Sequence, residues 1–456
     1  MVVKKLSFFA LVLLIVSAVD SNRNLPSAAI FGAPLIFFFL FSALFFLFPV
    51  SLISAELGTL SERKGGIYHW VRLAFGEKAG VVAIWLQWVQ AISWFPTILT
   101  FIAGTGAFLI QPELMSNKTY MVFSISIVFW ALTLVNLRGI QISAKLNEIF
   151  CLIGTLIPTL ALIVLGIIWI SKGESVAISV SMQSIIPSFS ELSPWTALVA
   201  IMTSFAGMEL AGVHMRSIEN PRKAFPRAVI LSSFVVLASM MFGALAIALV
   251  LPAQSIHLAG GLMQVFAAFF KKFHLDAWII VVSLMILVGS FGNLINWILA
   301  PAKGLLNASE HGYLPSFFAK VNKNGVASRI LVIQAVLVTC LCSLFLLLPS
   351  VNAVYWFLMA TSSSLYTIMY ILMFFSAIRL RNTFPRNAFH VPGGNLGLFG
   401  ICGIGLIGCI ITLFVTFVPP PNIQIASPLK YAIMMLCANL FLIFPVFLLF
   451  LKKKKS

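Results

Sequence analysis

The sequence predicts an all-α membrane protein with twelve transmembrane helices: a five-plus-five inverted repeat with broken first and sixth helices, then two additional C-terminal helices. Of the 456 residues, 61% are hydrophobic and only 9% are charged, and the mean hydropathy is +1.07. These values lie far outside the range of soluble domains. Two further observations support this fold class, namely the lengths of the apolar runs and the matching interruptions in two of them, at residues 20–26 and 204–209.

The twelve helices are expected where apolar runs are long enough to cross about 30 Å of hydrocarbon. Their approximate spans are 6–32, 34–58, 79–110, 119–137, 147–170, 195–215, 228–251, 275–301, 330–348, 352–378, 395–418 and 429–451. The hydrophilic stretches between these runs are too short for a separate soluble domain. We therefore expect one transmembrane domain over residues 1–456.

The two interrupted runs each open a half of five helices. The first interruption reads Asp-Ser-Asn-Arg-Asn-Leu-Pro and the second reads Ser-Phe-Ala-Gly-Met-Glu. Non-helical backbone at membrane depth is tolerated only where protein or a water-filled cavity surrounds it, and paired broken helices indicate a substrate site. Five helices per half place the halves in opposite orientations. The pattern predicts a secondary transporter, with repeats at about 6–170 and 195–378 and extra helices at about 395–451.

Basic residues are strongly biased to one side of the predicted membrane. If the N-terminus is cytoplasmic, the opposite side holds only Lys118, Lys172, Lys271, Lys272 and Lys430. Because basic residues beside membrane segments are retained in the cytoplasm, we expect a multi-pass protein of the cell inner membrane with both termini cytoplasmic. The same bias accounts for the net charge of +17, so the lipid bilayer is the expected partner and nucleic acid is not.

Several classes of function are disfavoured by missing motifs. The six cysteines lie in apolar runs without histidines at metal-ligand spacing, which predicts buried small hydrophobes and neither a metal site nor a cofactor. The sequence contains no HExxH or GxSxG motif, so we do not expect an enzyme. Polar residues gather around the two interruptions rather than along a continuous path, which disfavours a channel.

Five segments resemble known transporters. The string GGIYHWVRLAFG at 65–76 resembles the loop after the second helix in the amino acid-polyamine-organocation (APC) superfamily. The segments that resemble the bacterial glutamate/GABA antiporters are SFAGMELAGVHMRSIENPRKAFPRA at 204–228, NWILAPAKGLLNASEHGYLPSFFAKVNKNGV at 296–326, FHVPGG at 389–394 and FVPPPNIQ at 417–424. The resemblance implies a five-plus-five fold with two extra helices that exchanges one amino acid for another by alternating access.

The resemblance also assigns four side chains to a substrate pocket. Glu209 resembles the acidic residue of the sixth helix, Trp297 the pocket tryptophan of the eighth, and Tyr366 and Tyr370 the paired tyrosines of the tenth. From the residues alone, Glu209 either contacts a substrate ammonium or a proton, or holds helices together through hydrogen bonds. Packing is the default role for each aromatic residue, although the i, i+4 spacing of the two tyrosines puts both hydroxyls on one helix face.

The helix ends at the interruptions are expected to bind the charged groups of an amino acid. Free N–H groups and the positive dipole end suit a carboxylate, and free carbonyls suit an ammonium. The alternative at the first interruption is a proline kink at Pro26 without a ligand. Gln90 and Trp94 share a face of the third helix and are candidates to line the same cavity. The binding residues predicted at the interruptions are Ser21, Asn22, Arg23, Asn24, Phe205, Ala206 and Gly207.

The chain departs from the glutamate/GABA antiporters in its intramembrane charges. Asn293 stands where those antiporters carry a glutamate, and Asp20 and Arg23 lie in the first interruption. An ionisable group at mid-membrane is costly and normally pairs or functions. Asp20 and Arg23 therefore either form an ion pair with each other or take part in substrate binding and gating. In the second case Arg23 binds an acidic side chain, and Asn293 removes a repulsive charge.

Coupling or gating is assigned to Asp20, Glu209 and Glu148. Glu148, near the cytoplasmic end of the fifth helix, either pairs with Lys145 or carries a proton. Glu56, near the cytoplasmic mouth, is expected to be solvated, with a gate salt bridge as the alternative. The chain stops at Ser456, so we do not expect gating by the long cytoplasmic tail that plugs the antiporter.

Together these features predict a secondary active amino acid transporter, an antiporter of the glutamate/GABA type that works by alternating access. Two alternatives remain open: a proton-coupled importer of a neutral amino acid or polyamine precursor, and a non-transporting amino acid sensor with the same pocket. The expected partner is a small-molecule amino acid, accompanied by protons in the importer. The sequence leaves open the substrate side chain, the ion coupling and the oligomeric state.

Overall fold

The protein is all-helical, as predicted. The structure is a computed structural model that describes residues 7–452 apart from 61–65, 140–143, 211, 213–217, 311, 313, 384, 386–387 and 421–426. The helices of the first part of the chain are α1 (Phe8–Val19), α2 (Asn24–Ala29), α3 (Leu35–Ser42), α4 (Phe48–Leu60), α5 (Ile67–Phe75), α6 (Glu77–Ile110), α7 (Lys118–Leu137), α8 (Ala144–Cys151) and α9 (Ile157–Ser171).

In both parts of the chain, short helices beside an interruption come before the long helices. The helices of the second part are α10 (Met182–Ile185), α11 (Ala197–Ser204), α12 (Pro221–Val250), α13 (Gly261–Phe273), α14 (Trp278–Glu310), α15 (Ser328–Cys342), α16 (Leu344–Leu347), α17 (Val351–Leu380), α18 (Gly394–Val415) and α19 (Pro428–Lys452). Two π-helical turns join neighbouring helices into longer spans, η1 (Ala43–Leu47) between α3 and α4 and η3 (Leu152–Leu156) between α8 and α9.

Ten helical spans in the part of the chain that the structure describes are long and apolar enough to cross a membrane. They coincide with ten of the predicted runs, from Leu35–Thr59 to Pro428–Phe450. The other two predicted runs are the interrupted ones, which the structure divides into short helices.

The first interruption is shorter than predicted. Helix α1 ends at Val19, the backbone of Asp20 is extended (φ −69°, ψ 124°), and α2 begins at Asn24. The irregular backbone therefore spans residues 20–23 instead of 20–26. Pro26 lies in the first turn of α2, where the missing N–H of a proline would have no helical partner in any case. We call residues 20–23 the first break.

The second interruption follows α11 directly. Residues 205–207 form a turn, and Gly207 has a φ of +117°, a region that L side chains rarely adopt. Residues 208–210 then form a short 3-10 turn. The predicted sixth helix, expected over 195–215, is thus helical only to Ser204 before the break, and its end lies mostly outside the described residues. We call residues 205–207 the second break.

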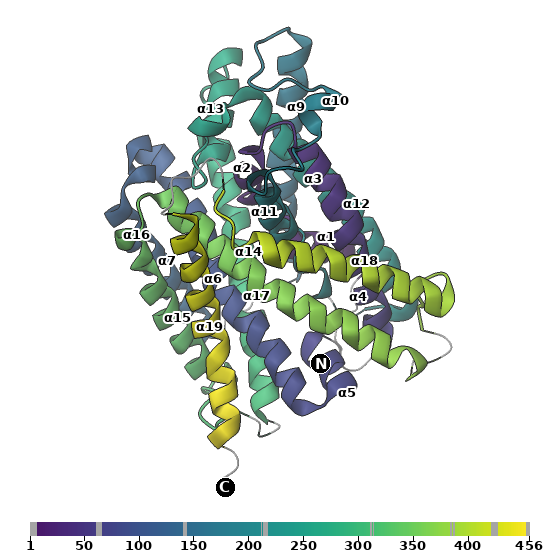
Figure 1. The fold of residues 1–456 in the computed structure, drawn as a ribbon. Coiled ribbons are helices and arrows are strands. Elements are labelled where there is room, and N and C mark those ends of the chain that lie inside the picture. Colours follow the sequence, from purple (N-terminus) through teal and green to yellow (C-terminus); the bar gives the residue numbers. More distant parts are fainter. Residues whose placement is uncertain are drawn as a thin grey trace.

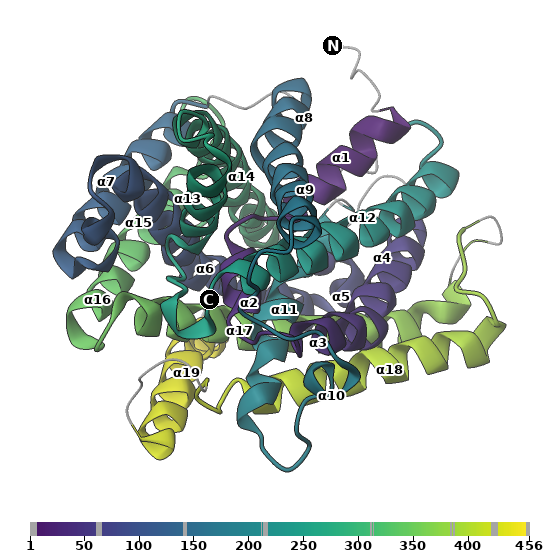
Figure 2. The ribbon, with the colours of Figure 1, turned by 90° about the horizontal axis from the view of Figure 1, so that it is seen from above.

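The broken helices lie inside the bundle. Seen from above, α2, α11 and α17 lie near the centre, α7, α15 and α16 lie at one edge, and α18 and α19 lie at another (Figure 2). Helix α6 packs against both α17 and α14. In the side view, α10 and α13 lie at the opposite end of the molecule from α5 (Figure 1). The long helices α6, α14 and α17 therefore surround the breaks.

Two glycines allow α14 to approach the fifth predicted span closely. A β-carbon built on Gly154, in η3, would lie 2.2 Å from the α-carbon of Gly289, in α14. No side chain fits between these two backbones, and small residues are the usual means of close helix approach in membranes. The contact brings η3 and α14 together beside the first break.

A buried ion pair joins the ends of three segments near α5. The Glu56 carboxylate on α4 is fully buried, and the Arg381 guanidinium lies 2.5 Å from its Oε1 atom. The backbone N–H of Val391 donates to Oε2 at 2.7 Å. The expectation that Glu56 is solvated is therefore wrong, because the chain before α18 folds back over the end of α4 and supplies a donor to the carboxylate.

We expect Arg381→Gln to be strongly destabilising, because it leaves a buried carboxylate without its cation. The loss in free energy of unfolding should be about 3–5 kcal/mol, measured by thermal unfolding in detergent. Arg379→Gln is the matched control: Arg379 is exposed and contacts only the Phe75 ring, at 5.4 Å, among the contacts described, so it should lose about 1 kcal/mol or less. Equal losses in the two variants would contradict the burial argument.

Candidate functional site

The second break packs against the end of α1, and residues of both breaks line one cavity. A β-carbon on Gly207 would lie 3.2 Å from the Ala18 carbonyl oxygen, so the second break directly contacts the end of α1. A small, partly open cavity lies beside this contact. Its lining residues come from both breaks and from α6, α14 and α17: Ala18, Val19, Ser21, Arg23, Asn24, Gln90, Trp94, Thr203, Ala206, Asn293, Trp297 and Tyr366.

Arg23 brings a buried cation to this cavity. Its side chain is 1% exposed, and Nη1 donates to the Thr97 hydroxyl at 2.8 Å. The Tyr355 hydroxyl donates to the Arg23 carbonyl oxygen at 3.0 Å, and the guanidinium carbon lies 4.9 Å from the centre of the Trp94 ring. No carboxylate of the described residues lies within ion-pair distance of it. A buried cation without a counter-ion favours an anionic ligand.

Asp20 points away from the cavity, and its expected ion pair with Arg23 does not form. Its carboxylate is fully buried, and the Ser239 hydroxyl on α12 donates to Oδ2 at 2.5 Å. The extended backbone of Asp20 separates the two charges, because it turns the carboxylate towards α12 while Arg23 turns towards α6. Of the two alternatives for this pair, the structural ion pair is wrong.

Asn22 joins the first break to the fifth predicted span. Its Nδ2 atom donates to the Gly154 carbonyl at 3.0 Å, and the Thr159 hydroxyl donates to its Oδ1 atom at 2.7 Å. The nitrogen and the oxygen of the side-chain amide thus both have partners. Asn22 is not among the cavity-lining residues. Its geometry indicates that it holds the break in place, and its predicted contact with substrate stays a prediction.

Two side chains of α14 occupy carbonyl groups at the end of α1. Asn293 Nδ2 donates to the Ser17 carbonyl at 2.7 Å, and Trp297 Nε1 donates to the Ala18 carbonyl at 3.3 Å. Each of these carbonyls thus already accepts one hydrogen bond and keeps a second lone pair, and the expected contact of the helix end with a substrate ammonium stays a prediction. An ionised glutamate has no donor for a carbonyl, so an asparagine at 293 is the residue type that this contact needs.

Glu209 lies behind the cavity wall, where it accepts three hydrogen bonds. The Tyr366 hydroxyl and Gln87 Nε2, the latter at 3.1 Å, donate to Oε1. The Tyr370 hydroxyl donates to Oε2 at 2.6 Å and accepts a hydrogen bond from the Gly207 N–H at 2.8 Å. Glu209 thus connects the second break to α6 and α17. Tyr366 stands between the carboxylate and the cavity, so this arrangement favours the role of holding helices together.

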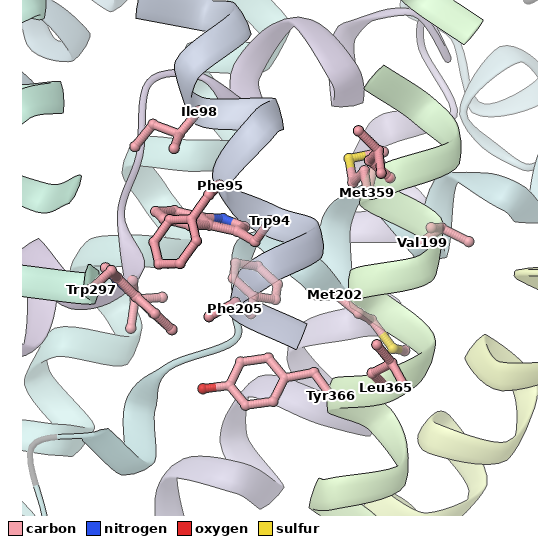
Figure 3. Packing of buried hydrophobic residues seen from close by; sticks show 14 of the residues in the cluster. Trp94, Phe95, Ile98, Val199, Met202, Phe205, Trp297, Met359, Leu365 and Tyr366 are labelled. Atoms are coloured by element: carbon pink, nitrogen blue, oxygen red, sulfur yellow. The ribbon is translucent and has the colours of Figure 1, made fainter. Parts of the chain in front are cut away.

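Aromatic rings form much of the cavity wall. The centres of the Trp94 and Trp297 rings are 5.1 Å apart, and the Tyr366 ring lies 6.5 Å from the Trp297 ring, edge-on. Figure 3 shows these rings around one space, with Phe205 between Trp94 and Tyr366. Phe205 itself packs edge-on against Phe39 at 5.8 Å. The predicted pocket positions of Trp94, Trp297 and Tyr366 therefore agree with this geometry, whereas Phe205 packs into the core.

Four residues of the cavity lining each have a buried polar atom without a partner in the described part of the chain. Arg23 Nε is a donor, and Asn24 Oδ1, Gln90 Oε1 and Asn293 Oδ1 are acceptors. Buried polar atoms in proteins are rarely left unpaired, and those that are call for an explanation such as a ligand or water. A zwitterion would satisfy both kinds, with its carboxylate at the donor and its ammonium at the acceptors.

The other candidate sites in the described residues lie outside this cavity. Glu148 lies on α8, one turn before Cys151, and is not part of the cavity lining. A second small hollow lies between α7, α14 and α15 and includes no residue of either break. The described residues contain no group of three or more His, Cys, Asp or Glu side chains that can hold a metal ion.

Several residues that hold the site together were not identified from the sequence as functional. Thr97 and Tyr355 fix the Arg23 guanidinium and its backbone, and Gln87 completes the hydrogen bonds of Glu209. A polar residue in an apolar helix was the only available signal for Gln87, and Thr97 and Tyr355 become recognisable only when α6 and α17 are placed beside the first break.

A helical membrane protein with two broken helices around a cavity that contains unpaired polar atoms has the architecture of a transporter, and the sequence comparison agrees. The chain matches the amino acid permease family over residues 6–439. The chain therefore belongs to this family, which confirms the predicted APC relationship and that it is a transporter and not an enzyme. Family membership implies the five-plus-five inverted-repeat fold.

Individual relatives cover almost the whole chain. An uncharacterized transporter of Legionella pneumophila is 39% identical over 426 residues, which is 93% of this chain and 92% of the relative. A glutamate/gamma-aminobutyrate antiporter of Lactococcus lactis is 31% identical over 429 residues, 92% of this chain and 85% of the relative. A probable agmatine/putrescine antiporter of the same species is 25% identical over 424 residues, 91% and 88% of the two chains.

The Tyr370 hydroxyl provides a direct test of the contacts around the second break. Tyr370→Phe leaves both the Gly207 N–H and one Glu209 oxygen unpaired, so we expect a loss of about 2 kcal/mol in the free energy of unfolding together with slower transport. Tyr120→Phe is the matched control, because it removes a single hydroxyl contact, to the Ala103 carbonyl at 3.0 Å, outside the cavity. Wild-type transport by Tyr370→Phe would show that the contact is dispensable.

Proposed function

We propose that the chain is an amino acid antiporter that exchanges glutamate-like substrates by alternating access, with the substrate bound between the two breaks. The observation that carries this proposal is the set of unpaired polar atoms in the cavity, one cationic donor and three neutral acceptors, beside a buried arginine without a counter-ion. The similarity to glutamate/gamma-aminobutyrate antiporters supports the same class of substrate.

In this proposal Arg23 binds the side-chain carboxylate of the substrate. A guanidinium presents several donors in one plane, which suits a carboxylate, and Nε has no other partner among the described residues. Asn24 and Gln90 offer amide oxygens to the ammonium group. The neutral Asn293 adds no negative charge to the cavity, so an ionised acidic side chain can enter.

The charge of the cavity argues against a cationic substrate. The similarity to a probable agmatine/putrescine antiporter raises that alternative. A polyamine would place further positive charge beside Arg23, whose guanidinium already lacks a carboxylate partner among the described residues. Like charges in a low-dielectric cavity repel strongly, so the substrate we propose is an anion or a zwitterion.

The proposed fold counts twelve spans, formed by the ten long ones together with α1–α2 and α11 with the chain after it. The two repeats then cover about residues 6–170 and 195–378, and α18 and α19 fall outside them. We place both termini in the cytoplasm of a cell with this protein in its inner membrane, from the bias of basic residues. The breaks are the points at which α1 and α11 can change direction during alternating access.

The function is tested by counterflow in proteoliposomes. Vesicles loaded with unlabelled glutamate receive labelled glutamate outside at neutral pH, and parallel vesicles contain glutamine, GABA, arginine or no amino acid. We expect labelled glutamate to accumulate only when an amino acid is inside, and least with arginine. Uptake into vesicles without internal amino acid would indicate an importer, and binding without exchange would indicate a sensor.

Arg23→Gln tests the assigned cation. Loss of a hydrogen bond to a charged group costs about 1.5–3 kcal/mol, so the KM for glutamate should rise by about tenfold to a hundredfold, while the KM for glutamine should change less. Arg329→Gln is the matched control, since Arg329 lies outside the cavity with its guanidinium 4.4 Å from the Phe317 ring. An unchanged ratio of the two KM values in Arg23→Gln would contradict the assignment.

Asn293→Glu restores the charge that the related antiporters carry. The new carboxylate cannot donate to the Ser17 carbonyl and repels an ionised substrate, so we expect glutamate exchange at neutral pH to fall by about tenfold or more. Asn293→Gln, which keeps the amide donor, should fall less. The exchange rate measured under saturating internal glutamate compares the two, and equal losses would contradict the charge argument.

A further inference from the structure

The small hollow between α7, α14 and α15 lies apart from the substrate cavity, where α7 ends and α15 begins. Its lining includes Asn136 of α7 and Lys303 of α14. The chain that leads into α15 is held against the end of α7, because the side-chain amides of Asn322 and Asn324 both donate to the Leu137 carbonyl, at 2.7 and 3.2 Å. The walls of the hollow are therefore fixed to one another.

Asn136 brings a buried hydrogen-bond acceptor to this hollow. Its side chain is 0% exposed, and Nδ2 donates to the Leu132 carbonyl at 2.9 Å. A carbonyl oxygen can only accept, so the amide nitrogen has to face it and the amide oxygen has to face away. That oxygen, Oδ1, has no partner among the described residues. Because buried polar atoms are rarely left unpaired, the hollow calls for a donor from outside the described chain.

Lys303 adds a positive charge to the same hollow. Its side chain is exposed, so it marks the opening, and no carboxylate of the described residues lies within ion-pair distance of it. Ala327, which precedes the first turn of α15, also belongs to the lining, and a helix begins with its positive dipole end. An acceptor inside and positive charge at the opening suit a ligand that carries a donor next to an anion.

The remaining lining restricts which donor can enter. Most of it is apolar, with Leu299, Leu306, Val326 and Leu331 among its residues. A primary ammonium is small and has N–H groups for Asn136 Oδ1. A trimethylammonium group is larger and has no N–H to donate, and a phosphate offers acceptors that would face another acceptor. The ammonium therefore belongs inside the hollow and the anion beside Lys303.

The position of the hollow favours a lipid as the ligand. Leu134 on α7 and Val332 and Val336 on α15 are 56%, 40% and 47% exposed, and both helices lie at the edge of the bundle (Figure 2). Leu134 and Val332 each lie within one helical turn of a residue that lines the hollow. A lipid with its acyl chains on these side chains has its headgroup level with the hollow. Basic pockets between transmembrane helices are known to bind lipid headgroups.

We propose that this hollow binds the headgroup of a phosphatidylethanolamine lipid, whose ammonium donates to Asn136 Oδ1 while its phosphate lies beside Lys303. The headgroup then joins α7, α14 and α15 at one end of the bundle. Trp297 precedes Lys303 on α14 by less than two turns, so the lipid contacts a helix that also lines the substrate cavity. Binding at this hollow does not depend on which amino acid the protein transports.

The test is native mass spectrometry of the full-length protein, released from detergent after incubation with phosphatidylethanolamine, phosphatidylcholine or phosphatidylglycerol of the same acyl chains. We expect one phosphatidylethanolamine to be retained about tenfold more tightly than either other lipid, since only its ammonium makes a charged hydrogen bond to Asn136. Equal retention of phosphatidylcholine would overturn the site, as it would if the Lys303 ammonium itself filled the hollow. Equal retention of phosphatidylglycerol would overturn the ammonium contact.

Two variants locate the binding. Lys303→Gln changes an exposed side chain and Asn136→Leu removes the acceptor, and each should lower the retention of phosphatidylethanolamine about tenfold. Lys78→Gln, an exposed lysine outside the hollow, and Thr133→Val, whose hydroxyl donates to the Phe129 carbonyl at 2.8 Å within α7, are the matched controls. Wild-type retention by Lys303→Gln would overturn the site even if Asn136→Leu failed to fold.

Soluble phosphoethanolamine separates a lipid from a free amine as the ligand. It carries the same ammonium and phosphate without acyl chains, so a tenfold molar excess over lipid should leave the bound phosphatidylethanolamine in place. Displacement of the lipid at that ratio would overturn the assignment to the bilayer.

Discussion

The structure depends on one constraint: backbone that leaves its helix at membrane depth must find other hydrogen-bond partners. Side chains from neighbouring helices supply them. Asn293 and Trp297 donate to carbonyls in the last turn of α1, Tyr355 donates to the Arg23 carbonyl, and the Gly207 N–H donates to the Tyr370 hydroxyl. The side chains that form these hydrogen bonds belong to α14 and α17, which also surround the cavity. The breaks and the proposed site therefore form one unit.

Three buried carboxyl groups differ in the hydrogen-bond and ion-pair partners around them. Glu56 has a guanidinium and a backbone N–H, which suits a permanent ion pair at the end of α4. Glu209 has three neutral donors, which suits a carboxyl group that holds α6, α17 and the second break together. Asp20 has a single serine hydroxyl.

Sequence reasoning recovered the elements that depend on composition and local pattern. Ten long spans and both breaks follow from apolar run length and from the polar residues that interrupt it, and the structure brings Arg23, Trp94, Trp297 and Tyr366 to one cavity. The direction of each side chain could not be predicted. Whether Asp20 turns towards Arg23 or Ser239 depends on the extended backbone at residue 20, and the burial of Glu56 depends on contacts with a segment over 300 residues away in sequence.

The most direct test of the substrate site is a density map of the protein in a lipid nanodisc with bound glutamate. We predict density for the amino acid in the cavity between the breaks, with a carboxylate within hydrogen-bond distance of the Arg23 guanidinium and the ammonium beside Asn24 and Gln90. Density confined to the hollow between α7, α14 and α15, or an empty cavity at a glutamate concentration that saturates exchange, would contradict the site.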